Sequence, residues 1–173
     1  MSVKTYQYRI YPTSQQAELI NKTIGCARLV YNKILADNIE QYEKTGKVKQ
    51  KTHTAFKEEC PFLSEVDSFA LTTAYNNVKT AYKNFFDGIK SGRKVGFPKF
   101  KSKHKSAQTY TTYNNAGQIR IEKKGLKLPK VGYVKVVWHR FCKGKIKHVT
   151  ISRTKTNKYR YSFNLYKTRR TKK

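Results

Sequence analysis

The stretch VKTYQYRIYPTSQQ, residues 3–16, decides the fold of this chain of 173 residues. Up to Pro12, larger apolar side chains alternate with polar ones such as Thr5, Gln7 and Arg9. This is the two-residue period of a β-strand. The face that carries the larger apolar side chains consists of Tyr6, Tyr8 and Ile10. Because a lone strand is not stable in water, we expect this strand to pair with strands that come much later in the sequence.

Two long helices are predicted after this strand. Thr13, followed three residues later by Gln16, is typical of a capping box at the start of a helix. Apolar residues then recur at helical spacing until Gly46, where we expect the first helix to end. A second apolar stripe predicts a helix over about residues 64–87, with Ser64 as its N-cap.

After residue 106 the period of the sequence changes to two, and turn residues separate short runs. The strand candidates are 109–113, 118–122, 125–128, 131–139, 145–153 and 159–166. Short connections favour antiparallel pairing, and unpaired edges favour closure. We therefore expect an α+β fold: an antiparallel β-barrel, with a helical unit inserted after its first strand. The predicted domains are a barrel of residues 1–12 and 107–173, and a helical domain of residues 13–106.

Charge is distributed very unevenly along the chain. There are 38 Lys+Arg against 10 Asp+Glu, a formal net charge of +28. Residues 1–87 account for only +3 of it, and residues 88–173 for +25, with Glu122 as the single acid of the second half. Since 38% of the residues are hydrophobic and 13% aromatic, the chain is expected to fold rather than to form a disordered basic tail. Nucleic acid is the expected partner.

Membrane, secreted and metal-binding classes receive no support. No apolar run approaches the ~20 residues of a membrane span, and the N-terminus lacks the apolar region of a signal peptide. We therefore expect no membrane association and a cytoplasmic location. The three cysteines lie far apart without a Cys-x-x-Cys pair, and the four histidines show no metal-ligand spacing with them. We assign no metal site.

A basic loop, SGRKVGFPKFKSKHKS, occupies residues 91–106. Phe97 and Phe100, with Pro98 between them, alternate with its lysines. A purely electrostatic tail has no need of these side chains, so we expect a loop that is anchored to the core and presents ammonium groups to a phosphate backbone. The alternative is a solvated basic linker.

The polar face of the second predicted helix is uncharged from Ser68 to Val78. Short hydroxyl and amide side chains such as those of Thr72 and Asn76 can hydrogen-bond to the edges of bases and so discriminate one base from another. A lysine cannot discriminate bases in this way. The alternative is an ordinary solvated or packed helix face.

Several runs resemble the TnpB (OrfB) proteins of bacterial insertion sequences. The matching runs are YRIYPTSQQAELINKTIGCARLVYNKIL (residues 8–35), AYKNFFDGIKSGRKVGFPKFKSK (81–103), KLPKVGYVKV (127–136) and GKIKHVTISR (144–153). The resemblance covers about residues 4–166. It implies an RNA-guided DNA nuclease with a wedge-type β-barrel that is split by a helical recognition domain. The implied location is the bacterial cytoplasm, in association with the nucleoid. The implied partners are a guide RNA and double-stranded DNA that carries a short motif beside the target.

One part of the family pattern is missing from this sequence. In the family a nuclease domain with three acidic metal ligands and a paired-cysteine zinc site follows these strands. Here no acid follows Glu122, so the chain is expected to bind nucleic acid rather than cut it. It looks like the N-terminal half of a family member, without cofactors of its own; divalent metal and zinc are expected only in the nuclease part.

The resemblance also implies site residues. The positions expected to read the DNA motif match Ser68, Thr72, Tyr113 and Asn114, with Lys51 in the loop after the first helix. The candidate contacts with the RNA or DNA backbone are Arg9, Arg28, Lys99, Lys101, Lys103, Arg140, Lys147 and Arg153. For Arg28, the alternative is a structural role, either as an ion pair with Asp37 or Glu40 or through packing of its side-chain stem.

Three functions are consistent with these observations. The first is the guide-RNA- and motif-binding half of an RNA-guided nuclease. The second is an RNA-directed repressor that occludes DNA without a nuclease. The third is a helix-turn-helix DNA-binding protein, an accessory of a transposon, that needs no RNA.

Overall fold

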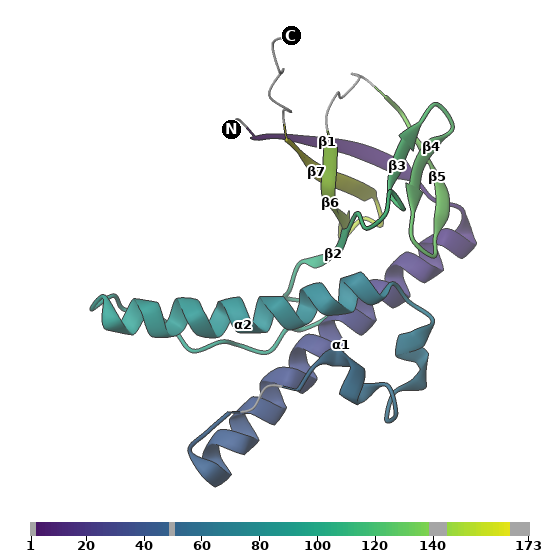
Figure 1. Ribbon diagram of the computed structural model, residues 1–173. Helices are drawn as coiled ribbons and strands as arrows, with labels where there is room; N and C mark the ends of the chain where they lie inside the picture. The colour runs from purple at the N-terminus through teal and green to yellow at the C-terminus, as the bar shows by residue number, and fades with distance from the viewer. Residues whose placement is uncertain (1–2, 49–50, 139–144, 167–173) are drawn as a thin grey trace. The chain divides into compact units, whose positions relative to one another are not determined.

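The computed structural model describes residues 3–48, 51–138 and 145–166 (Figure 1). The chain divides into two compact units. The sheet unit comprises Met1–Lys22 with Ala107–Lys173, and the helical unit comprises Thr23–Ser106.

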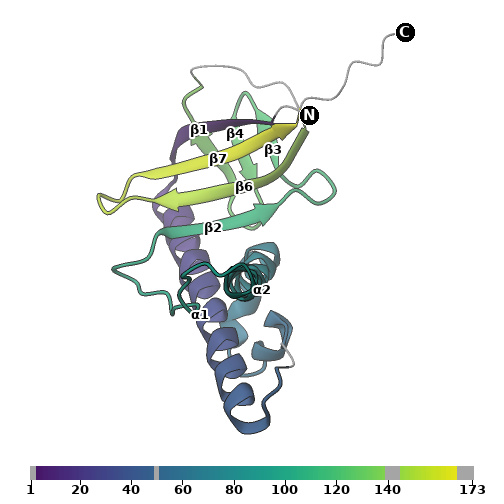
Figure 2. The same cartoon turned by 90° about the vertical axis from the view of Figure 1, so that its left-hand side faces the viewer.

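One antiparallel sheet makes up most of the sheet unit (Figure 2). Its strands are β1 (Val3–Tyr11), β2 (Gln108–Tyr113), β3 (Arg120–Glu122), β4 (Gly125–Leu128), β5 (Gly132–Val136), β6 (Lys145–Arg153) and β7 (Tyr159–Tyr166). They are arranged in the order β2-β6-β7-β1-β5-β4-β3. The predicted strands are therefore confirmed, although β3 and β5 are shorter than expected.

Strand β1 lies inside this sheet, as its instability in isolation requires. It pairs with β7 from Val3, opposite Tyr166, to Ile10, opposite Tyr159. At its end Ile10 and Tyr11 also pair with β5. The N-terminal strand thus joins two groups of strands that lie about a hundred or more residues later in the chain.

The sheet is open, so the predicted β-barrel is wrong, whereas the α+β class is confirmed. Within the described residues no pairing joins the two edge strands, β2 and β3. Edge strand β3 has only three residues, and β1 meets β5 through two residue pairs. Alternation along a strand specifies which side chains face the core, but it carries no information on whether the first and last strands of a sheet meet.

A group of aromatic rings packs together in the core of the sheet unit. Tyr8 stacks on Tyr161 and on Phe163, with ring centroids 5.4 and 6.0 Å apart. Trp138 packs edge-on against Tyr8 at 5.3 Å. All of these except Trp138 are at most 2% exposed, and burial of each such side chain contributes roughly 1.5–3 kcal/mol to stability.

The first helix, α1 (Ser14–Thr45), begins and ends as the sequence predicts. The Thr13 hydroxyl accepts a hydrogen bond from the Gln16 amide, and the Gln16 side chain accepts one from the Thr13 amide, at 3.3 and 3.1 Å. Gln16 also donates its side-chain amide to the carbonyl oxygen of Tyr133 in β5, at 2.7 Å. Gly46, with φ +65°, ends the helix.

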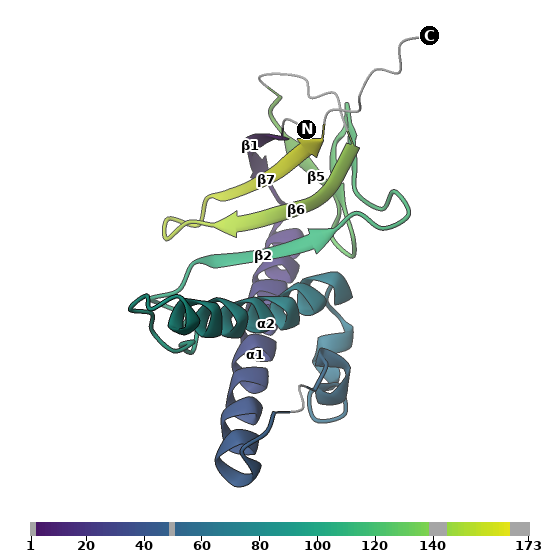
Figure 3. The ribbon, with the colours of Figure 1, turned by 60° about the vertical axis from the view of Figure 1, so that its left-hand side comes forward.

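The second helix, α2 (Ser68–Lys90), begins later than predicted, and in the helical unit it crosses α1 (Figure 3). Two short 3₁₀ turns, η1 (His53–Phe56) and η2 (Pro61–Ser64), precede it. Ser64 belongs to η2, so its predicted role as N-cap is wrong. Asp67 caps α2 instead, accepting a hydrogen bond from the Phe69 amide at 3.0 Å. The largest fully buried aliphatic side chains of the unit are Ile34, Leu35, Leu63 and Leu71.

Replacing Gly125 by Ala should destabilise the sheet unit. Gly125 has φ +140°, and a Cβ atom there would collide with the carbonyl group of Val134 on the neighbouring strand. We expect a loss of about 2–4 kcal/mol in the free energy of unfolding, measured with denaturant by Trp138 fluorescence. Gly117→Ala is the matched control, since its φ is +72° and nothing lies near its Cβ position, so it should cost about 1 kcal/mol. Equal losses would contradict the role of the collision.

Candidate nucleic-acid interface

The basic loop of residues 91–106 is tied to α1 by a two-way hydrogen-bond clamp. The side-chain amide of Asn32 donates to the backbone carbonyl of Lys101 at 2.9 Å. Its side-chain oxygen accepts from the backbone amide of the same lysine at 2.8 Å. Because both backbone groups of Lys101 are satisfied, the loop holds a fixed path at this point without forming regular secondary structure.

A second anchor lies where the loop leaves α2. Phe97 packs edge-on against Tyr82 and Phe85, with centroid distances of 5.6 and 5.3 Å. The anchoring predicted for the loop is therefore confirmed for Phe97. Both rings are partly exposed, Phe97 by 45% and Phe100 by 56%, but among the described residues only Phe97 of the two packs on other aromatic rings.

The loop cations fall into two groups. The exposed side chains are Arg93, Lys94, Lys99, Lys103 and Lys105. Lys101 is half-buried, and its ammonium group lies 4.2 Å from the centroid of the Tyr31 ring. Burial lowers the pKa of Lys101 below its usual value. Of the three loop lysines predicted to contact a nucleic-acid backbone, Lys99 and Lys103 are exposed, whereas Lys101 chiefly helps to hold the loop.

The predicted motif-reading residues of the helical unit lie at two places. Ser68 is exposed in the first turn of α2, and the Thr72 hydroxyl donates to the Ser68 carbonyl at 3.0 Å. With its proton engaged in this way, Thr72 keeps acceptor capacity toward a base. Lys51 forms an ion pair with Asp37 at 2.6 Å, and this hydrogen bond raises the pKa of Lys51. The Lys51 ammonium is therefore held by a carboxylate of α1.

In the sheet unit, Asn114 holds a turn. Its side-chain amide donates to the carbonyl oxygens of Ile119 and Ile146, at 3.1 and 3.2 Å. Its side-chain oxygen accepts from the Ile119 amide at 2.9 Å. The neighbouring Tyr113 is 39% exposed, with its ring edge-on to His148 at 6.1 Å. Tyr113 thus offers a surface, while Asn114 is occupied with structural hydrogen bonds.

Two predicted backbone contacts of the sheet unit have different surroundings. Arg9 is exposed, and its guanidinium lies 5.0 Å from the Tyr11 ring centroid. Arg153 is half-buried and donates to the side-chain oxygen of Asn21 at 3.0 Å. Arg9 therefore faces solvent, whereas one nitrogen of Arg153 has a structural partner.

The remaining candidates can be placed briefly. Lys147 is exposed on β6, and Arg28 is half-buried on α1. Arg140 lies outside the described residues. The five predicted motif-reading residues are divided between the units, with Ser68, Thr72 and Lys51 in the helical unit and the other two in the sheet unit.

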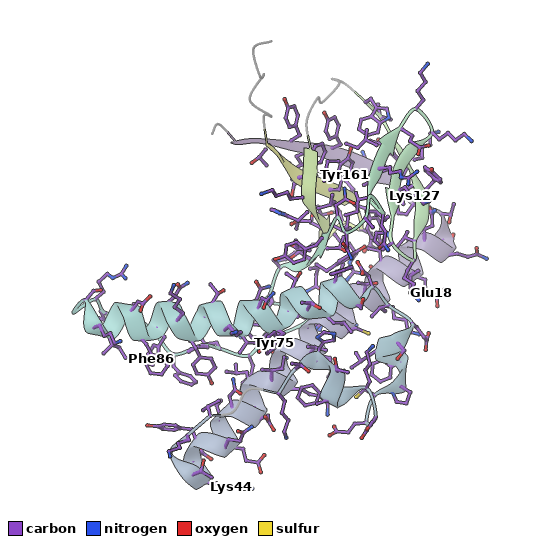
Figure 4. The ribbon with its side chains drawn as sticks, viewed as in Figure 1. Glu18, Lys44, Tyr75, Phe86, Lys127 and Tyr161 are labelled. Carbon is purple, nitrogen blue, oxygen red and sulfur yellow. The ribbon has the colours of Figure 1, made fainter. Side chains whose placement is uncertain are left out.

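Sequence reasoning missed two features of the outward sheet face. Arg160 lies directly opposite Arg9 in the β1–β7 register, and neither forms an ion pair within the described residues. Lys127 lies over the ring of its cross-strand neighbour Tyr133, 5.6 Å from the centroid (Lys127 is labelled in Figure 4). Alternation indicates which residues face outward, but only the strand register shows that these become neighbours.

Neither a metal-ligand cluster nor a membrane-spanning helix is found among the described residues. In the part of the chain that the structure describes, no three His, Cys, Asp or Glu side chains are grouped as metal ligands. No described helix is both long and apolar enough to cross a bilayer.

Relatives of the chain carry related names. A protein of Streptomyces pristinaespiralis, named "Putative RNA-guided DNA endonuclease", is 36% identical over 133 residues, covering 69% of this chain and 32% of its own. The Escherichia coli K12 protein "Putative RNA-guided DNA endonuclease InsQ" is 25% identical over 163 residues, covering 88% of this chain and 38% of its own. The chain thus spans about a third of the length of these two relatives.

A third relative is shorter. "Virulence protein VsdF" of Salmonella dublin is 34% identical over 109 residues, which are 55% of this chain and 89% of that protein. In addition, residues 1–47 match the family model described as the helix-turn-helix domain of OrfB in IS605 elements. In the structure this stretch contains β1 and α1. Together with the motifs described above, these matches show that the chain belongs to the TnpB (OrfB) family.

Proposed function

We propose that this chain is the nucleic-acid-binding part of an RNA-guided DNA endonuclease, which binds a guide RNA and reads a short DNA motif beside the target. One observation carries the proposal. A loop with five exposed cations is clamped to α1 by Asn32, in a chain similar to proteins named as RNA-guided DNA endonucleases.

The clamp matters because it orders the loop before RNA binds. A flexible basic tail loses conformational freedom when it binds a phosphate backbone, whereas a loop fixed at Phe97 and Lys101 has already lost it. Such a loop presents its ammonium groups in a defined path. This arrangement suits an RNA that is recognised by shape and backbone, with sequence left to base pairing.

Motif reading is assigned to the first turns of α2. Ser68 and Thr72 are short side chains with free acceptor capacity and are not surrounded by lysines on α2. Hydroxyl groups can hydrogen-bond to either bases or phosphates, and at this position they would meet base edges if α2 enters a groove. Tyr113 is the candidate on the sheet unit; Asn114 would have to give up hydrogen bonds in order to take part.

A plain helix-turn-helix DNA-binding protein has less support. Over the residues that match the helix-turn-helix family model, α1 runs without interruption from Ser14 to Thr45, so no turn separates two short helices there. An RNA-directed repressor would use the same contacts as the proposed function. It differs in what happens to the bound DNA.

The proposed function is tested by the nucleic acid that the protein carries. The chain, purified from cells that contain its genomic locus, should copurify with one enriched structured RNA, identified by sequencing. That complex should then retain DNA from a random library that shares a short motif beside a guide-matched target. Absence of any enriched RNA would refute both RNA-dependent functions. Cleavage of bound DNA by the complete encoded protein, or its absence, separates nuclease from repressor.

Lys99→Ala should weaken RNA binding electrostatically. Lys99 is exposed on the clamped loop, so its loss should lower the slope of log affinity against log salt concentration by about one. Lys101→Ala is the matched comparison, because its ammonium faces the Tyr31 ring. The Lys101→Ala variant should keep most of the salt slope of the wild type, and its free energy of unfolding should fall by about 1 kcal/mol. Titrations at several salt concentrations measure the slope, and identical slopes for both variants would contradict this division of roles.

Thr72→Ala should reduce discrimination among DNA motifs. Loss of one base contact should lower the preference for the best motif by about 1–3 kcal/mol while leaving the affinity for unrelated DNA unchanged. Thr72→Ser keeps the hydroxyl group and should retain the preference. Binding to a motif library measures both quantities. A uniform loss on every DNA sequence would show that Thr72 has no role in reading bases.

A further inference from the structure

An aromatic cluster at the end of α2 is not used by the proposed contacts. Tyr82, Phe85, Phe86 and Ile89 follow one another at helical spacing over the last turns of α2. Phe97 of the loop packs on Tyr82 and Phe85. The rings of Tyr82 and Phe86 are stacked with centroids 6.3 Å apart, and Phe85 and Phe86 meet edge-on at 5.4 Å. These five residues are called the aromatic cluster below.

Much of the aromatic cluster is exposed to solvent. Phe86 is 53% exposed, Ile89 54% and Phe97 45%. Phe86 is labelled near the end of α2 in Figure 4, beside further rings. Single exposed apolar side chains are common, but several contiguous rings of this kind indicate a binding surface.

The backbone holds the aromatic cluster in place. Gly92, with φ +66°, reverses the chain after α2, and the Arg93 amide donates to the Gly88 carbonyl at 2.9 Å. The loop then passes so close to the helix that a Cβ atom on Gly88 would lie 2.6 Å from a methyl carbon of Val95. The relative positions of Phe86 and Phe97 are therefore set before any ligand arrives.

The positive charge around the aromatic cluster indicates which kind of ligand it binds. Lys83 and Lys90 flank Phe86 along the helix, three residues before it and four after it. Residues 79–106 contain nine Lys/Arg and one acid, Asp87. A second copy of the chain would bring the same positive charge to the interface, and an uncharged protein surface would leave these cations without partners. Unpaired nucleotides bring both an aromatic plane and a phosphate.

We propose that the aromatic cluster is a stacking platform for unpaired bases of single-stranded nucleic acid. Phe86 receives the base, and Lys83 and Lys90 receive the adjacent phosphates. Bases inside a duplex stack on one another and offer no free face, so the platform selects single-stranded segments. This inference rests on the proposed function only in taking nucleic acid as the partner. It adds the structural state of that nucleic acid, which the loop cations alone do not specify.

A series of substitutions at Phe86 tests the proposal. The probes are a deoxythymidine oligomer of about twelve nucleotides, an abasic oligomer of the same length, and a duplex of the same length. Phe86→Ala and Phe86→Leu should weaken binding of the deoxythymidine oligomer roughly 5- to 100-fold, and Phe86→Tyr and Phe86→Trp should keep it. None of the four should change binding of the abasic oligomer or of the duplex, and the salt slope should stay constant, because no charge is altered.

Other outcomes would overturn the proposal. If Phe86→Leu binds the deoxythymidine oligomer as well as the wild type, the cluster serves only as an apolar surface for a protein segment. Equal losses on the abasic oligomer would show an indirect effect on the cations. Since Phe86 is more than half exposed, the variants should melt at nearly the wild-type temperature, and circular dichroism checks this. The Phe86 series and the search for a copurifying RNA can fail independently, so each proposal is judged by its own result.

Discussion

The pairing of β1 with β7 and β5 is the interaction on which the rest of the sheet unit depends. Eight consecutive residue pairs join β1 to β7, and two further pairs, at Ile10 and Tyr11, join β1 to β5. Without β1 the sheet would separate into β2-β6-β7 on one side and β5-β4-β3 on the other. The buried rings stacked on Tyr8 would then lose their central member. The capping box at Thr13 and Gln16, and the bond from Gln16 to Tyr133, start α1 directly from this strand.

The parts of the chain differ in how many charges they carry and in how firmly those charges are held. The helical unit has few net charges before residue 88 and carries the short hydroxyl side chains of α2, which suit recognition of bases. The loop that follows is rich in cations. Because Asn32 and Phe97 fix its path, these cations are held at defined positions. On the outward face of the sheet, Arg9 and Arg160 lie opposite each other. Like charges in this position oppose folding slightly and favour an anionic partner.

The range of each interaction explains what could be predicted from the sequence. The strands, the two ends of α1 and its capping box depend on residues a few positions apart, and these predictions were confirmed. The N-cap of α2 failed because Ser64 and Asp67 are both suitable caps, and the 3₁₀ turn after Pro61 decides between them. Closure of the sheet depends on strands β2 and β3 meeting in space, which no local pattern encodes. Likewise, the residues that neighbour Lys101 in the sequence do not distinguish it from Lys99. The difference is the contact of Lys101 with the ring of Tyr31 on α1, which lies far away in the sequence.

The position of β1 in the sheet also has a consequence for how the protein is made. Ribosomes synthesise the N-terminus first, yet Val3 pairs with Tyr166 and Tyr8 with Tyr161, near the other end of the described chain. During translation β1 therefore waits without its main partner while the helical unit, complete by residue 106, can already fold behind it. The entropy of closing so long a loop makes this pairing a slow step. Until this pairing forms, the nascent chain exposes the edge of an unpaired strand, and during this period the chain is most prone to aggregate.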